Sequence, residues 1–291
     1  MEKYLKTFLD GYYGYWNYLT SEILYPSWHN YFYWLLGLSL AVWGLELIFP
    51  WRKDRPVFRK DFWLDAFYMF FNFFLFSLIV YNSLSNVFVE LFNDFLGLFG
   101  ITNLVALEVN TWPVWGQFLL MFLVADFIQW NVHRMLHRVP WLWEFHKVHH
   151  SVEQMGFAAH LRYHWMETVV YKSVQYIPLA MIGFGLDDFF VLHIFTILIG
   201  HLNHANVKIS YGPFRYIFNN PIMHTWHHAK HLPAGSHGVN YGISLSLWDY
   251  LFGTAYIPHD GRDEPLGFEN VEEFPSGFWE QVRYPWGKKK K

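Results

Sequence analysis

The sequence predicts an all-α integral membrane protein with about four to five transmembrane helices. Of its 291 residues, 53% are hydrophobic and 22% aromatic, whereas only 15% are charged. In a typical soluble domain about a quarter of the residues are charged. Much of this chain is therefore expected to face lipid. Several apolar runs are also about 20 residues long, which is the length that a helix needs to cross a bilayer.

Five apolar runs meet this length, and a further stretch does not. The stretch 86–107, "NVFVELFNDFLGLFGITNLVAL", is interrupted by Asn93, Asp94 and two glycines. We therefore expect it to be re-entrant or to lie on the membrane surface. The predicted spans are 31–49, 63–81, 113–130, 168–183 and 188–206.

The positions of the basic residues predict the orientation. Basic residues gather at 51–60, in and after the segment 133–150, and at the end of the chain, whereas 82–112 contains none. If the spans alternate, every basic cluster lies on one side, and the positive-inside rule makes that side the cytoplasm. We expect a multi-pass protein of the inner membrane if bacterial, or of the endoplasmic reticulum if eukaryotic. The expected organisation is an N-terminal membrane region (1–112), a central functional domain (113–256) and a cytoplasmic tail (257–291).

Charge and cysteine content exclude several classes of function. The net charge of -3 gives no basic field for nucleic acid. The chain has no cysteine, which excludes disulfides, thiolate-bound iron–sulfur clusters and cysteine nucleophiles. Histidine, with 17 residues, is the residue in excess.

Ten histidines form four groups with the spacing of one helix face. Residues at i, i+3 and i+4 share a face, and the predicted spans bring all four groups to the cytoplasmic side. Ten imidazoles exceed the needs of one ion but suit two neighbouring ions of iron, zinc or copper. The sequence therefore predicts a cytoplasmic helical cap that holds a histidine-rich dimetal site. The predicted ligands are His133, His137, His146, His149, His150, His201, His204, His224, His227 and His228.

Two other metal chemistries use histidines at similar spacings. Arg134 stands where the glutamate of an HExxH zinc protease would be, which argues against that class. A bis-histidine haem protein stays open, but it needs histidines paired across two spans within the membrane. The alternative function is accordingly a non-enzymatic membrane carrier of metal or haem.

The motifs HxxxH at 133–137, HxxHH at 146–150, a histidine pair at 201–204 and HxxHH at 224–228 resemble the fatty acid hydroxylase / sterol desaturase superfamily of membrane di-iron oxygenases. The segment "GVNYGISLSLWDYLFGTAY" at 238–256 is similar to the block that follows the last histidine motif. The resemblance covers about half of the chain, and the compact bacterial members and the alkylglycerol monooxygenases look most similar. One departure is Trp165, which replaces the proline of the family's His-Pro-x-Glu.

The resemblance implies a function and its cofactors. The chain would hold two iron ions (Fe2+), use O2 as co-substrate, and hydroxylate or desaturate a membrane lipid such as a fatty acyl lipid, an ether lipid or a sterol. Two electrons would come from a separate donor, such as a ferredoxin, cytochrome b5 or reduced pterin. Residues 113–256 would then be the catalytic domain.

Five polar residues are candidates for supporting the ligands. His164 and Glu167 keep the histidine and the glutamate of the family's His-Pro-x-Glu motif. Asp126 lies two helical turns before His133 and either orients a ligand histidine or makes a buried hydrogen bond to a neighbouring helix. Asn240 and Asp249 either support the site or have local roles, Asn240 in a turn and Asp249 as a helix N-cap.

The remaining histidines lie away from the four groups. We interpret His29, His193 and His259 as structural or surface residues. The sequence leaves His160, His231 and His237 undecided.

Overall fold

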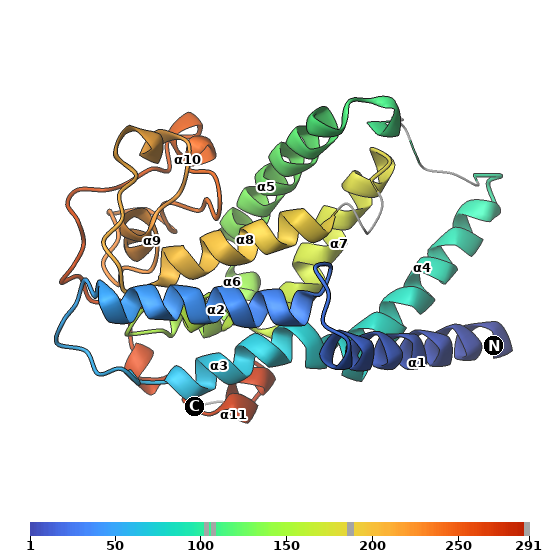
Figure 1. Cartoon of the computed structure of the whole chain (residues 1–291), viewed down its shortest axis with the longest axis horizontal. Coiled ribbons are helices and arrows are strands. Elements are labelled where there is room, and N and C mark those ends of the chain that lie inside the picture. Colours follow the sequence, from blue (N-terminus) through green and yellow to red (C-terminus); the bar gives the residue numbers. More distant parts are fainter. Residues whose placement is uncertain (102–104, 106–108, 185–188, 288–291) are drawn as a thin grey trace.

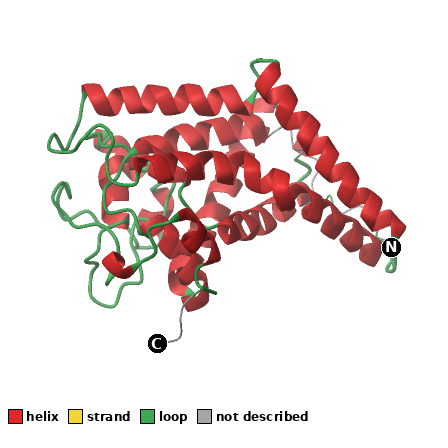
Figure 2. Ribbon diagram, turned by 90° about the horizontal axis from the view of Figure 1, so that it is seen from below, coloured by secondary structure: helices red, strands yellow, loops and turns green. Residues whose placement is uncertain are grey.

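A computed structural model describes residues 1–101, 105, 109–184 and 189–287. Within these residues the fold is helical, with isolated bridges and no strand (Figures 1 and 2). The predicted all-α class is therefore confirmed for the described part of the chain. The helices are α1 (Glu2–Leu24), α2 (Tyr31–Ile48), α3 (Phe62–Phe70), η1 (Phe71–Leu75), η2 (Ser77–Tyr81), α4 (Asn82–Gly97), η3 (Val109–Thr111), α5 (Val114–Arg138), α6 (Pro140–His150), η4 (Phe157–Leu161), α7 (Trp165–Met181), α8 (Phe189–His204), η5 (Gly212–Tyr216), α9 (Pro221–His227), α10 (Leu247–Leu251), η6 (Val271–Glu273) and α11 (Phe278–Arg283).

Two helices are long and apolar enough to cross a membrane, judged by length and composition. They are α2 and the continuous helix Phe62–Gly97, whereas α8 is a shorter apolar helix. The other predicted spans fall largely on α5, α7 and α8, and the start of the last one, at 188, lies outside the described residues. The number of four to five spans thus stays a prediction.

The helix Phe62–Gly97 combines the second predicted span with most of the stretch expected to be re-entrant. Its 36 residues correspond to about 54 Å at 1.5 Å per residue, well beyond the about 30 Å of a bilayer core. Two π-helical turns, η1 and η2, lie where the helix changes direction between α3 and α4 in Figure 1. The chain does not turn back over 86–97, so the re-entrant alternative is wrong there. The other alternative, that this stretch lies on the membrane surface, stays a prediction.

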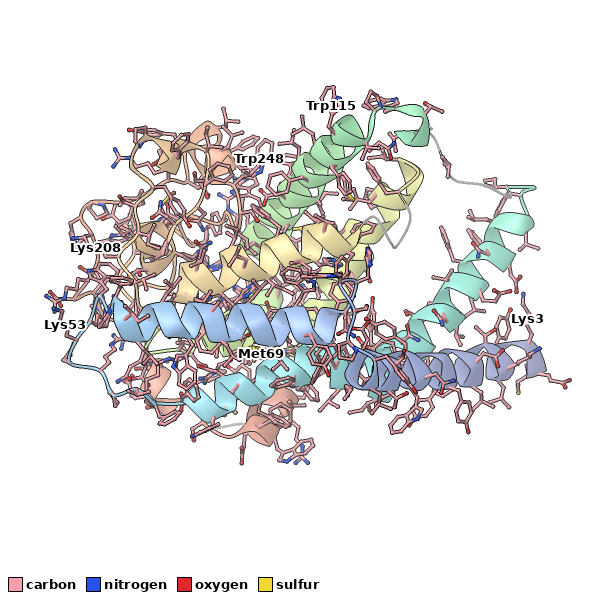
Figure 3. All side chains as sticks on the ribbon, in the orientation of Figure 1. Lys3, Lys53, Met69, Trp115, Lys208 and Trp248 are labelled. Carbon is pink, nitrogen blue, oxygen red and sulfur yellow. The ribbon has the colours of Figure 1, made fainter. Side chains whose placement is uncertain are left out.

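The polar residues that suggested an interruption are instead paired with α1. The carboxylate of Asp94 accepts hydrogen bonds from the Lys3 ammonium (2.7 Å) and the Tyr4 hydroxyl (2.8 Å). Helix α1 packs along α4, and the two project to one side of the molecule, with Lys3 near the tip (Figures 1 and 3). The pairing of these two helices lets α4 continue as a helix through Asp94.

The opposite end of the molecule carries most of the loops (Figure 2). Here α5 leads into α6, and α8 packs against α9 and η4. Pro140 begins α6 at a position that needs no amide donor. The Asn220 side chain caps α9 by accepting from the amides of Ile222 and Met223. These two short helices bring their histidines to the C-terminal ends of α5 and α8.

Candidate metal centre

Nine of the ten predicted ligand histidines come together in two groups. Within each group, one potential ligand atom per residue lies within 4.8 Å of those of the others, and every member is buried. We call them the first and the second group. The first group is His133, His137, His146, His150 and His227, and the second group is His149, His204, His224 and His228.

Consecutive histidines divide between the two groups. His149 and His150 end α6 but belong to different groups. His227 ends α9 and His228 follows it directly, and these two also belong to different groups. The rings of His150 and His228 stack across the boundary, with centroids 4.4 Å apart. Each HxxHH motif therefore serves both groups, so two ions bound there would be neighbours.

In the first group, three of the five histidines donate a hydrogen bond from Nδ1 to a backbone carbonyl of the loop 237–241. The Nδ1 atoms of His133 and His227 lie 2.7 Å and 2.8 Å from the carbonyl oxygens of Tyr241 and Val239. The Nδ1 atom of His137 lies 3.2 Å from the carbonyl of residue 237. A carbonyl only accepts, so each Nδ1 carries the proton and each Nε2 is left with a lone pair.

The second group shows this arrangement in two of its members. Nδ1 of His149 donates to the carbonyl of Arg162 (3.0 Å), and Nδ1 of His204 donates to the carbonyl of Gly200 (2.8 Å). The Nε2 atoms of His204 and His149 are 3.3 Å apart, and those of His204 and His224 are 3.0 Å apart. The bare nitrogens of His149 and His204 thus face each other across a hydrogen-bond distance.

Such an arrangement is suited to a bound cation. Within the described residues, Nε2 of His137 and both ring nitrogens of His228 are buried without a hydrogen-bond partner. Burial lowers the pKa of His149 to about 3, and burial and the neighbouring imidazoles hold the pKa of His224 and His228 well below the usual value. Neutral imidazoles with inward lone pairs attract a metal ion, whereas in its absence they repel one another. The residues present therefore fit two ions bound by nitrogen.

Glu167, on α7, contacts the first group directly, whereas the side chain of His164, which directly precedes α7, bonds elsewhere. A carboxylate oxygen of Glu167 lies 2.8 Å from Nδ1 of His146, and burial raises the pKa of Glu167 to about 8. His164 is not a ligand, because its Nε2 donates to the carbonyl of Val282 (2.9 Å) while its Nδ1 accepts from the amide of Met166 (3.1 Å). Trp165, which replaces the family's proline, donates to the same carbonyl of Val282 (3.0 Å).

Asn240 and Asp249 hold the loop whose carbonyls orient the first group. The buried amide of Asn240 donates to the carbonyls of Met223 (2.9 Å) and Tyr256 (2.8 Å). Asp249 accepts from the amides of Tyr241 (2.9 Å) and Gly242 (2.8 Å). Both residues therefore support the site through the backbone and touch no ligand histidine directly.

Asp126 makes a buried hydrogen bond to a neighbouring segment, the second of its two predicted roles. Its carboxylate accepts from the indole of Trp248 (2.9 Å), which lies beside α5 in Figure 3, and from the amide of Ser244 (3.3 Å). It is not bonded to His133, whose Nδ1 is taken by Tyr241. Asp126 thus ties α5 to the loop before α10.

His201 lies outside both groups. Its Nε2 is 3.1 Å from the hydroxyl of Ser39 on α2, and its Nδ1 is 3.2 Å from Nδ1 of His160. The spacing of three residues from His204 separates the two rings by about 60° around the helix, enough for His201 to face α2 instead. We therefore do not count His201, which the sequence predicted as a ligand, among the proposed ligands.

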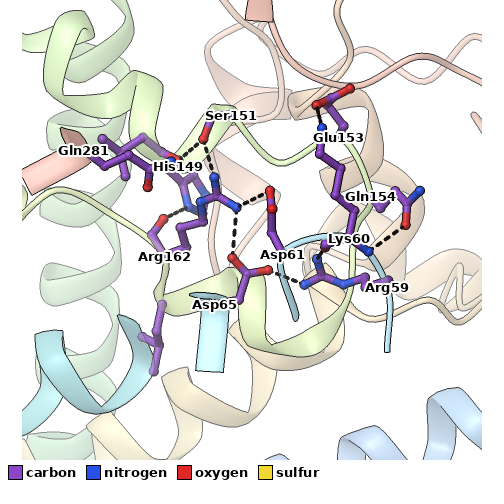
Figure 4. A network of polar contacts seen from close by, with 12 residues as sticks. Arg59, Lys60, Asp61, Asp65, His149, Ser151, Glu153, Gln154, Arg162 and Gln281 are labelled. Carbon is purple, nitrogen blue, oxygen red and sulfur yellow. Dashed lines mark hydrogen bonds and ion pairs between the residues drawn. The ribbon is translucent and has the colours of Figure 1, made fainter. Parts of the chain in front are cut away.

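A buried ionic network supports the segment that orients His149 (Figure 4). The guanidinium of Arg162 bonds to the carboxylates of Asp61 (3.0 Å) and Asp65 (3.1 Å) and to the hydroxyl of Ser151 (2.9 Å). Asp65, which is fully buried, also pairs with Arg59. Two cations and two carboxylates balance, as a buried network requires.

The sequence interpretation missed these partners because most of them act through the backbone. A carbonyl at 237, 239 or 241 has no signal in the residue type. Arg162 does leave a signal, since an arginine beside predicted membrane spans needs a carboxylate partner.

The fold and the site define a helical protein with membrane-length helices and two adjacent groups of buried histidines suited to two metal ions. Residues 118–254 match the family described as fatty acid hydroxylase. This match, over just under half of the chain, confirms the resemblance that the histidine motifs indicated.

Similar proteins include the ornithine lipid hydroxylase OlsE of Rhizobium tropici, 34% identical over 180 residues, which cover 62% of this chain and 53% of that protein. The alkylglycerol monooxygenase of Homo sapiens is 33% identical over 135 residues, 46% of this chain and 29% of that protein. That of Xenopus tropicalis is 32% identical over 151 residues, 51% and 31% respectively. The matches thus span about half or less of these relatives. No solved structure matches.

Proposed function

We propose that this chain is a membrane-bound oxygenase that holds two iron ions and hydroxylates or desaturates an amphiphilic lipid. The observation that carries the proposal is the pair of buried histidine groups, five and four imidazoles, within a fatty acid hydroxylase segment. Imidazole suits iron, although zinc and copper accept it as well. Iron is chosen because the similar proteins include lipid hydroxylases and monooxygenases.

When bound, the iron pair supplies O2 activation, and with two external electrons and two protons one oxygen atom enters a C–H bond of the lipid while the other leaves as water. The chain's own residues position and desolvate this centre. The outward Nδ1 bonds of His133, His149 and His227 hold their rings in one orientation. Burial of all nine imidazoles excludes bulk water from the reacting carbon.

The substrate is proposed to be an amphiphile that reacts near its polar end. The groups lie at the ends of α5 and α8, where a lipid entering from the bilayer would present carbons close to its headgroup. Among the relatives, one is named for an ornithine lipid and several for an alkylglycerol. Both names are of amphiphilic lipids, in keeping with this substrate class.

The site is proposed to face the cytoplasm, where an electron donor can dock. The basic clusters and the ends of α5 and α8 share one side in the predicted topology. A ferredoxin, cytochrome b5 or reduced pterin would supply the two electrons, because the cysteine-free chain has no thiolate ligands for an iron–sulfur cluster.

The test combines metal analysis with labelled oxygen. Purified full-length protein should hold about two iron ions per chain, as two imidazole groups require, and should show no haem absorption. Cells expressing the parent chain under 18O2 should contain a lipid with one labelled oxygen, or a lipid that lacks two hydrogens. The matched control is a strain expressing His150→Ala, which keeps the fold but lacks one ligand of the first group.

The outcomes separate the oxygenase from the alternative of a non-enzymatic carrier. Bound haem, or metal without any lipid product, would support the carrier and contradict the oxygenase. Unchanged lipids together with an oxidised water-soluble metabolite would contradict the lipid substrate alone.

A further inference from the structure

Helix α8 supplies one imidazole to the second group, whereas α5 supplies two to the first. On α5, His133 and His137 are four residues apart and both belong to the first group. Residues at this spacing share a helix face. Four residues before His204 on α8, the corresponding position is Gly200. The second group therefore has four imidazoles where the first has five.

The space over Gly200 is filled by the ring of His160. A Cβ atom added at Gly200 would lie 2.1 Å from both Cε1 and Nε2 of His160. The His160 ring is also close to that of His204, with centroids 5.4 Å apart. His160 comes from η4, which packs against α8. An imidazole from another segment thus occupies the room that a side chain at position 200 would take.

The hydrogen bonds around His160 leave its Nε2 available. The hydroxyl of Ser39 donates to the sulfur of Met69 (3.3 Å), so it accepts from Nε2 of His201 (3.1 Å). Nδ1 of His201 then has no proton and accepts from Nδ1 of His160 (3.2 Å). In this tautomer Nδ1 of His160 carries the proton and its Nε2 keeps a lone pair, the same pattern as in His149 and His204.

We propose that His160 is the fifth imidazole of the second group and binds its metal ion through Nε2, with His201 as the outer partner of its Nδ1. The inference rests on the proposed two-metal function. His160 lies beside the set of donors within 4.8 Å of one another, not inside it. The proposal therefore requires its ring to move toward His204 when the ion binds.

The test is a titration of metal-depleted full-length protein with ferrous iron alone, without O2, followed by counting bound ions. The parent should bind two ions. His160→Ala should bind the ion of the first group as the parent does. It should bind the ion of the second group at least about tenfold more weakly, a loss no smaller than that caused by removing an outer partner. Mössbauer spectra with 57Fe should show the change in one iron only. His193→Ala, which removes a half-buried histidine bonded to Tyr31 of α2, is the matched control and should bind both ions.

Two further variants test the role of His160 if His160→Ala misfolds. Gly200→Ala should weaken the second ion by displacing the His160 ring, although alanine is the better helix former. The double variant His160→Ala/Gly200→His should restore the second ion, because it supplies the imidazole from the position used on α5.

Unchanged binding of both ions by His160→Ala and by Gly200→Ala would overturn the assignment of His160 and leave the proposed function intact. A parent chain that binds no pair of ions would instead overturn the proposed function itself.

Discussion

The two histidine groups differ in what holds their outer nitrogens. In the first group, the loop 237–241 accepts from His133, His137 and His227, and Glu167 bonds to His146. These partners lie within the family segment 118–254. The first group is therefore oriented from within that segment.

The second group has weaker support. Its direct partners, the carbonyls of Arg162 and Gly200, lie in the same segment, but Arg162 is itself held by residues outside it. Nδ1 of His149 binds the carbonyl of Arg162, whose side chain is held by Asp61 and Asp65 of the N-terminal region. The Nδ1 atoms of His224 and His228 are buried without a partner among the described residues. Because outer partners typically change metal affinity by about 10–100-fold, we expect the first group to bind its ion more tightly.

The largest effect should follow from removing a ligand of either group. His137→Ala and His228→Ala should each abolish lipid oxidation, because the proposed reaction needs both ions. Metal counting should separate them: the first variant should lose the ion of the first group and the second variant the ion of the second. His29→Ala, at an exposed position, should keep activity and both ions. Full activity in either ligand variant would remove its group from the site.

The grouping of the histidines could be predicted from the sequence to within one residue. Spacings of three and four residues are helical, and the four motifs fall on one predicted membrane face, so the sequence predicts that these histidines meet, as nine of the ten do. That they bind metal stays a prediction. His201 could not be separated from His204, because the sequence does not indicate which neighbour a ring faces. Here Ser39, distant in sequence, bonds to it.

A second effect should appear when the network behind His149 is broken. Asp65→Asn keeps the shape but leaves Arg59 and Arg162 short of one buried charge. Breaking one partner of a buried ion pair typically costs about 3–5 kcal/mol. We expect a lower free energy of unfolding and weaker binding of the second ion, with the first ion unaffected. The measurements are denaturant unfolding and iron titration.

The exposed pair Lys60–Glu153 provides the control for Asp65→Asn. It lies in the same region (Figure 4), but both side chains reach solvent. Lys60→Met should therefore change stability by less than about 1 kcal/mol. Equal losses of both ions in Asp65→Asn would contradict separate support of the two groups.

Glu167→Gln should weaken the ion of the first group, whereas Asp65→Asn should weaken the ion of the second group. Glutamine keeps an oxygen for the amide of His164 but turns an NH2 group toward Nδ1 of His146. An NH2 group only donates, so Nδ1 of His146 can no longer donate outward and leave the lone pair on Nε2. The ion of the first group should bind about 10–100-fold more weakly, as is usual for the loss of a carboxylate partner, while the second ion should bind as in the parent. Selective loss of the second ion would reverse the comparison.

The sequence predicts the features that depend on spacing along the chain, but not the contacts between distant segments. Apolar length predicts most of the long helices, and the spacing of Glu167 to His164 makes it a candidate. The route from Asp65 through Arg162 to His149 combines an ion pair between distant segments with a backbone carbonyl. Neither follows from spacing along the chain.

The smallest effect should come from Asn72, which joins the π-helical turn η1 to the segment behind His149. Its buried amide donates to the carbonyls of Leu161 (2.9 Å) and Tyr163 (2.8 Å), on either side of Arg162. Asn72→Ala should lower the free energy of unfolding by about 1–3 kcal/mol, because buried carbonyls lose their donor. The second ion should bind only severalfold more weakly, since the ionic network still holds Arg162. Asn82, whose amide binds the carbonyl of Gly11 at the crossing of α1 and α4, offers a matched control. Asn82→Ala should lower stability by a similar amount without changing either ion, and a loss of the second ion in both variants would show that general loosening, not this contact, governs the second group.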